Sequence, residues 1–136
     1  MIGAAASASA IYILKLLFTP KKTIERYDVD ARFTDATKYG GLVFISGQIG
    51  EGSTIEEQTK SALNYVDEAL KKAGTDKSKV VEATIWLADI EKDYDGMNKV
   101  YDSWIIPGKP PCRACIQAKL AKKEWKVEVR VIAAAN

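Results

Sequence analysis

Apolar residues recur at intervals of three and four between residues 54 and 73, a spacing that predicts one apolar face of an α-helix. Thr54, with Glu57 three residues later, forms a capping-box pattern, and Gly74 is typical of the position just after a helix. The apolar stripe consists of Ile55, Ala62, Leu63, Val66, Ala69, Leu70 and Ala73. A second amphipathic helix is predicted over residues 94–105, before a Pro-Gly pair, through Met97, Val100, Tyr101 and Trp104.

Shorter segments with alternating or β-branched apolar residues predict strands. There are six of them, at residues 23–29, 32–38, 42–46, 80–88, 113–120 and 125–133. The order is therefore three strands, helix, strand, helix and two strands, without an internal repeat or a low-complexity linker. This order predicts a compact α+β domain with both helices on one face of the sheet.

The last predicted strand has two chemically different faces. Its valines, at positions 127, 129 and 131, share one face, which we expect to pack on the helices. Lys126, Glu128 and Arg130 share the other face. The pattern leaves two interpretations open: a face in contact with solvent, or a face covered by another subunit with a site at the seam.

Residues 1–22 are rich in alanine and serine and contain no acidic residue. Their apolar run is interrupted by Lys15 and is too short to span a membrane. A cleaved signal, an organellar presequence and an ordered extension remain open, and we favour a variable extension outside a domain formed by residues 23–136.

Composition limits the chemistry that the chain can perform. Its 136 residues, of which 47% are hydrophobic, suffice for one packed core. The 20 basic residues are nearly balanced by 18 acidic ones and are scattered, so no nucleic-acid surface is expected. Histidine is absent, which removes the commonest general base and metal ligand. Catalysis would have to use carboxylates, Arg, Lys, Tyr, Cys or the backbone.

Both cysteines lie in a C-x-x-C pattern, at Cys112 and Cys115. A structural zinc site requires four Cys or His ligands, so no metal is expected. The segment from Arg113 onward alternates in polarity like a strand, in which residues three apart point to opposite faces. Thiols that pack as small hydrophobic side chains are therefore favoured over a redox pair.

Four blocks of the sequence are LVFISGQIG, EEQTKSALNYVDEALKKAG, GMNKVYDSWI and PPCRACIQAKL followed by KVEVRVIAA. In this order and spacing they resemble the RidA/YjgF family, also called the reactive intermediate deaminase or L-PSP family. The resemblance extends from about Arg32 to Ala135. The resemblance implies a chorismate-mutase-like fold of the bacillary type, with a six-stranded sheet, two helices on one face, and three subunits around a central barrel. It also implies clefts between subunits, in which Arg113 would hold the carboxylate of an enamine or imine acid such as 2-aminoacrylate. Glu128 would position the water that hydrolyses this acid to a 2-oxo acid and ammonia.

Four further positions are candidates for contact with the substrate, and at one of them the chain departs from the family. Phe33-Thr34-Asp35 replaces the Tyr-Ser-Gln of many members, which removes a hydroxyl that would face the ligand. Cys115 matches a cysteine near the ligand, although a packed strand thiol is an equal alternative. Gln48 either points its amide toward the cleft or satisfies local backbone. Asn98 either lies near the cleft or is a polar position on the second helix, and the latter is favoured.

Three classes of function follow. The first is a cofactor-free hydrolytic deaminase that acts on a small carboxylate substrate, and the second is a trimeric protein that binds small carboxylates without turnover. The third is an endoribonuclease, which the near-neutral charge and the missing histidine disfavour. We expect no membrane partner and a cytoplasmic location, or an organellar one if residues 1–22 are a presequence.

Overall fold

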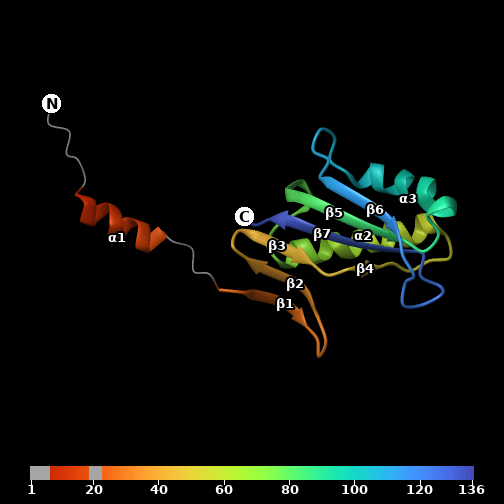
Figure 1. The fold of residues 1–136 in the computed structure, drawn as a ribbon, viewed down its shortest axis with the longest axis horizontal. Coiled ribbons are helices and arrows are strands. Elements are labelled where there is room, and N and C mark those ends of the chain that lie inside the picture. The colour runs from red at the N-terminus through yellow and green to blue at the C-terminus, as the bar shows by residue number, and fades with distance from the viewer. Residues whose placement is uncertain (1–6, 19–22) are drawn as a thin grey trace.

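The computed structural model describes residues 7–18 and 23–136. An N-terminal helix, α1 (Ala8–Phe18), precedes the sheet, so part of the extension is helical (Figure 1). The strands that follow are β1 (Glu25–Val29), β2 (Thr34–Tyr39), β3 (Leu42–Ile45), β4 (Gln48–Ile49), β5 (Val80–Leu87), β6 (Cys112–Gln117) and β7 (Val127–Ala134). The helices that pack on the sheet are α2 (Ile55–Lys72) and α3 (Ile90–Trp104), and a single 3₁₀ turn, η1 (Lys77–Lys79), precedes β5.

The strands form one mixed sheet in the order β1-β2-β3-β7-β5-β6, and β4 also pairs with β7. Neighbouring strands are antiparallel except β5 and β6, because α3 connects these two strands as a crossover. All six predicted strands are present, and the predicted α+β class is confirmed. The two-residue β4 was not predicted, because it is too short to show an alternating pattern.

The two helices begin at side-chain caps. The Thr54 hydroxyl accepts a hydrogen bond from the Glu57 amide, and the Glu57 carboxylate accepts one from the Thr54 amide, so the predicted capping box is confirmed. The predicted start of the second helix at residue 94 was wrong by one turn. Asp89 caps α3 by accepting a hydrogen bond from the Lys92 amide at 3.1 Å. The first turn was missed because it carries charged residues and precedes the apolar stripe.

A buried glutamine of α2 ties two loops to the helix. Gln58, which is 3% exposed, donates hydrogen bonds through Nε2 to the carbonyls of Gly52 and Glu124 and accepts one from the Lys126 amide. The backbone of Gly50 also approaches α2 so closely that an added Cβ would lie 1.9 Å from the Gln58 carbonyl oxygen. These contacts fix β4 and the start of β7 against α2.

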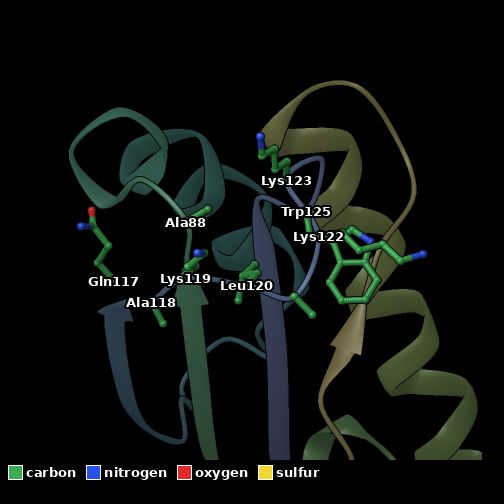
Figure 2. A pocket seen from close by; sticks show the side chains of 9 residues that line it. Ala88, Gln117, Ala118, Lys119, Leu120, Lys122, Lys123 and Trp125 are labelled. Atoms are coloured by element: carbon green, nitrogen blue, oxygen red, sulfur yellow. The ribbon is translucent and has the colours of Figure 1, made fainter.

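The loop between β6 and β7 borders a hollow of about 630 Å³ near the ends of β5 and β6 (Figure 2). Its polar lining comes mainly from Lys119, Lys122 and Lys123, beside the ring of Trp125. The Lys122 ammonium lies 5.2 Å from the centre of this ring. The lining contains no acidic side chain, so this hollow offers no carboxylate base.

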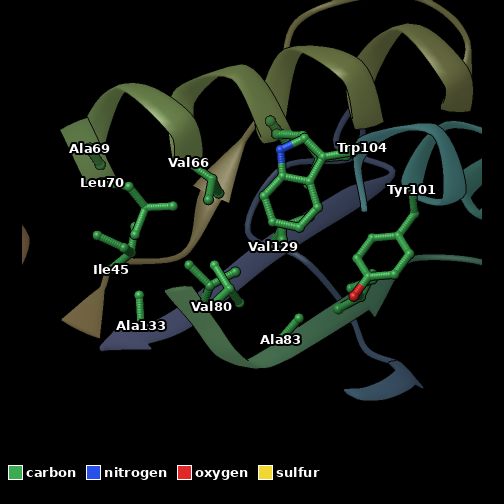
Figure 3. Packing of buried hydrophobic residues seen from close by; sticks show 14 of the residues in the cluster. Ile45, Val66, Ala69, Leu70, Val80, Ala83, Tyr101, Trp104, Val129 and Ala133 are labelled. Carbon is green, nitrogen blue, oxygen red and sulfur yellow. The ribbon is translucent and has the colours of Figure 1, made fainter. Parts of the chain in front are cut away.

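The core lies between one face of the sheet and the helices α2 and α3. Figure 3 shows Val66 and Leu70 of α2 and Trp104 of α3 above side chains of the sheet, such as Val129. The three valines at 127, 129 and 131 are at most 1% exposed, as their shared face predicted. The indole N–H of Trp104 donates to Asp67 at 3.0 Å.

The opposite face of the sheet is uncovered in the single chain and carries both apolar and charged side chains. Phe44 and Ile116 on this face are 40% and 48% exposed. The guanidinium of Arg130 lies 5.8 Å from the centre of the Trp86 ring and 3.9 Å from Glu82 Oε1. A second protein surface could therefore bury apolar area on this face.

Candidate functional site

Arg113 extends from β6, an edge strand, toward α3. Its Nη1 donates to Asn98 Oδ1 at 2.6 Å, and its Nη2 donates to the Tyr94 hydroxyl at 3.3 Å. The guanidinium carbon also lies 4.8 Å from the centre of the Tyr101 ring, within the range of a cation–π contact. Three side chains of one helix thus fix the plane of a guanidinium that is itself exposed.

The spacing of these three residues explains why they converge. Positions 94, 98 and 101 are separated by four and three residues, so they lie along one face of α3. Asn98 was expected near the cleft or as a mere polar position, and the structure places it against Arg113. Tyr94 and Tyr101 were not predicted as site residues. The spacing of the two tyrosines from Asn98 indicated that they share its face of α3. Their contact with Arg113 could not be predicted, because it depends on how β6 lies beside α3.

The guanidinium of Arg113 lies over the ring of Tyr101. Tyr101 is 4% exposed, and its hydroxyl has no hydrogen-bond partner among the described residues. Burial raises the pKa of the Tyr101 hydroxyl, while the charge of Arg113 opposes this rise. A hollow of about 290 Å³ opens beside these two residues and is also lined by Asp102, Ile105, Pro110 and Pro111. Space for a small ligand therefore adjoins the guanidinium.

The two cysteines occupy opposite faces of β6, as predicted. Cys115 pairs with the buried Ile85 and is half-buried beside the core. Cys112 is exposed, and both thiols are free. Burial raises the pKa of Cys115, with Arg113 acting in the opposite direction, so the thiol is held in its neutral form. A neutral, packed thiol is a poor nucleophile.

Glu128 lies on the uncovered face of the sheet. It alternates with the buried residues Val127 and Val129, and it is paired with Trp86 of β5. The side chain is half-buried, and this burial raises the pKa of the Glu128 carboxyl. A Cβ added at Gly47 would lie 1.9 Å from Glu128 Oε1, so the glycine leaves the space that the carboxylate occupies.

Arg113 and Glu128 of the same chain are far apart. Ala83 of β5 pairs with Arg113 on one side and with Val131 on the other, which places Glu128 three residues along β7 from the level of Arg113. At roughly 3.3 Å per residue and 4.8 Å per strand, the separation is about 10 Å along the strands and 10 Å across them, or about 14 Å between Cα atoms. The side chains also leave the sheet on opposite faces. One chain therefore cannot bring both groups to the same small molecule.

The remaining two predicted site residues, Gln48 and Phe33, form their hydrogen bonds with local backbone rather than with Arg113 or Glu128. Gln48 pairs with Val129, and its Nε2 donates to the Ser46 carbonyl at 3.1 Å, the local backbone role that was one of the two expectations. Phe33 precedes β2 and is 56% exposed, with its carbonyl accepting from the Asp30 amide. None of the predicted site residues lines the hollow of Figure 2.

Within residues 7–18 and 23–136, no group of three or more His, Cys, Asp or Glu side chains is arranged to hold a metal ion. In the same part of the chain, no helix has the length and apolar character needed to cross a membrane. The groups near Arg113 and Glu128 can bind a carboxylate, position a water and accept a proton.

Known proteins resemble this chain both in sequence and in fold. The model of the family "Endoribonuclease L-PSP" matches residues 23–135. A RutC family protein of Haemophilus ducreyi is 40% identical over 115 residues, which cover 83% of this chain and 97% of the relative. Reactive Intermediate Deaminase A, chloroplastic, of Arabidopsis thaliana is 33% identical over 109 residues, 74% of this chain and 57% of the relative. The crystal structure of a YjgF family member from Neisseria meningitidis superposes with a TM-score of 0.82 at 38% identity and covers 85% of this chain and 97% of that one.

Proposed function

Because the chain belongs to the Endoribonuclease L-PSP family, also called RidA/YjgF, which includes reactive intermediate deaminases, we propose that it hydrolyses small enamine or imine acids. The substrate class is that of 2-aminoacrylate, and the products are a 2-oxo acid and ammonia. The observation that carries this proposal is an exposed arginine whose plane is fixed by three side chains of α3 beside a hollow.

Arg113 would bind the substrate carboxylate. A guanidinium has five N–H donors, of which the contacts to Asn98 and Tyr94 use two, so three remain for a ligand. The planar fork of an arginine matches the two oxygens of a carboxylate, which a lysine ammonium cannot do. Because α3 already holds the fork in one orientation, less conformational freedom is lost when the ligand binds.

Glu128 would act as the general base. In its ionised form it takes a proton from a water molecule while the water oxygen bonds to the carbon of the protonated imine and the C=N electron pair moves to nitrogen, which gives a neutral tetrahedral aminoalcohol. The same carboxyl group then gives this proton to the nitrogen. The C–N bond breaks with its electron pair on nitrogen, ammonia leaves, and the hydroxyl proton returns to the carboxylate as the carbonyl forms. The raised pKa of Glu128 favours this return of the proton near neutral pH. No cofactor is needed, since water is the only co-reactant.

The site would be built from two chains. The 14 Å separation and the opposite faces prevent Arg113 and Glu128 of one chain from sharing a substrate. An assembly in which the uncovered face of one subunit packs beside the β6 edge of the next would bury exposed apolar residues of that face and bring Glu128 of one subunit toward Arg113 of the next. A homotrimer with three equivalent sites is the arrangement that we propose.

The proposal is tested with 2-aminoacrylate produced from serine by a dehydratase, with pyruvate release followed in time. The wild-type protein should accelerate release, and Arg113→Ala should reduce kcat/KM by about 30- to 1,000-fold, the loss of about 2–4 kcal/mol expected for a charge-assisted bidentate pair. Arg113→Lys should restore only a small part of the lost kcat/KM, because a lysine ammonium lacks the planar fork of a guanidinium. Pyruvate binding should fall in the same variants. If Arg113→Ala hydrolyses and binds as the wild type does, the proposed site is wrong.

A further inference from the structure

The N-terminal helix α1 has an unusual surface. Four successive residues, Ile11 to Leu14, are apolar or aromatic, and successive residues of an α-helix are rotated by about 100°. The apolar character therefore extends around the helix rather than along one stripe, and Lys15 is the one charged residue of α1. All four are exposed, and Ile11 and Ile13 have exposed fractions of 48% and 56%. Leu17, one turn further along α1, is 74% exposed. In Figure 1, α1 stands apart from the sheet and from α2 and α3.

An exposed helix that is apolar on all sides requires an apolar environment on all sides. A groove on a folded protein covers one face of a helix and would leave the opposite face in water. The interior of a lipid bilayer surrounds a helix completely. At 1.5 Å per residue, however, the 11 residues of α1 extend about 16 Å, roughly half of the 30 Å hydrocarbon core. The helix can thus insert into one side of a bilayer without crossing it.

Charge indicates which kind of bilayer fits. The first 24 residues contain Lys15, Lys21 and Lys22 and no acidic residue, the first of which is Glu25. Anionic lipid headgroups attract such lysines and repel acidic side chains. We propose that α1 binds the surface of membranes that contain anionic phospholipids, with its apolar residues in the outer part of the hydrocarbon region. This membrane contact replaces the expectation, drawn from the sequence, of no membrane partner. It is separate from the proposed hydrolysis, which uses residues of β6 and β7.

The test is sedimentation of the full chain with phospholipid vesicles. Vesicles of phosphatidylcholine with about one-quarter phosphatidylglycerol should bind the protein, pure phosphatidylcholine should bind it more weakly, and raising the salt to about 0.5 M should weaken binding to the anionic vesicles. Ile11→Glu and Ile13→Glu place a carboxylate on opposite sides of α1, about 200° apart. Each should reduce the partition coefficient at least about tenfold, because each removes a side chain from hydrocarbon and adds a repelled charge. Val29→Glu is the matched control, since Val29 is 68% exposed in β1 and outside α1.

The two variants distinguish insertion of α1 on all sides from contact with lipid through one face. Loss of binding in both, with Val29→Glu unchanged, supports insertion on all sides. Loss in only one of them would show that a single face of α1 contacts the lipid and would overturn the proposal. Failure of the wild type to bind anionic vesicles, or equal binding to both kinds of vesicle, would also overturn it. So would light scattering without vesicles that shows larger particles for the wild type than for Ile11→Glu and Ile13→Glu, because α1 would then pair with copies of itself.

Discussion

Two variants, each inactive when alone, should restore activity when their subunits are mixed. Arg113→Ala removes the carboxylate anchor and Glu128→Gln removes the base, so each homogeneous preparation should hydrolyse 2-aminoacrylate poorly. If each site takes its arginine from one subunit and its glutamate from the next, a mixed assembly contains some sites with both native residues. The expectation follows from the placement of Arg113 and Glu128 on opposite faces of the sheet, about 14 Å apart.

The size of the recovery can be worked out. In an equal mixture, a given site draws its arginine from a Glu128→Gln subunit with a probability of about one-half, and its glutamate from an Arg113→Ala subunit with the same probability. Random reassembly should therefore restore about one-quarter of the wild-type activity per total site. Sites built within one chain would contain at least one substitution in every case, and the recovery would then be zero.

The assay unfolds the two variants together in denaturant, removes the denaturant by dilution, and follows pyruvate release from dehydratase-generated 2-aminoacrylate. Each variant treated alone in the same way is the control for contaminating activity and for the residual activity of that variant. Wild-type protein carried through the same treatment sets the full scale. No recovery above the separate variants, in a preparation where wild-type protein recovers fully, would refute an intersubunit site that combines these two residues.

Three further predictions concern single residues. In the pH profile of kcat/KM, the fall in activity on the acid side should occur at a pH above the ordinary carboxyl range. Burial raises the pKa of Glu128, and the base is lost as the pH falls through that pKa. A fall at the pH typical of an exposed carboxyl would contradict this. Tyr94→Phe should raise KM about fivefold with little change in kcat, since it removes one hydrogen bond to Arg113, whereas Tyr65→Phe on α2 should have no effect in the same kinetic measurement. Gly50→Ala should lower the free energy of unfolding in urea by about 2–3 kcal/mol, because its Cβ meets the backbone of α2. Gly108→Ala, which has a φ of +76° and open space around it, should lower the same quantity by only about 1 kcal/mol, and equal losses would be inconsistent with these two causes.

The sequence was most informative where a pattern repeats. The stripe of α2 and the alternating valines of β7 each contain several apolar residues in phase, so the period and the buried face could both be read. Elements that depend on few residues were less visible. The first turn of α3 is defined by the Asp89 cap and charged residues, and β4 consists of two residues beside β7.

The candidate site shows a similar division. The chemistry of Arg113 and Glu128 could be proposed from residue type and from resemblance to a family. Their placement on opposite faces could not, because alternation within a strand fixes a face only relative to that strand. The register of both strands against β5 was needed to compare them. Similarly, the contact of Tyr94 with Arg113 joins residues 19 positions apart across a crossover connection.

The position of β7 in the sheet has a consequence for how the protein is made. β7 follows all other strands in the chain, yet it lies between β3 and β5 and joins the β1-β2-β3 hairpins to the β5-β6 pair. A nascent chain on the ribosome can form α2 and the early hairpins, but its two halves of the sheet stay unconnected until Val127–Ala134 has left the exit tunnel. Until then the apolar faces of α2 and α3 have no central strand to cover. Truncation before Val127 should therefore leave two separate sheet fragments that depend on chaperones, rather than a slightly shortened enzyme.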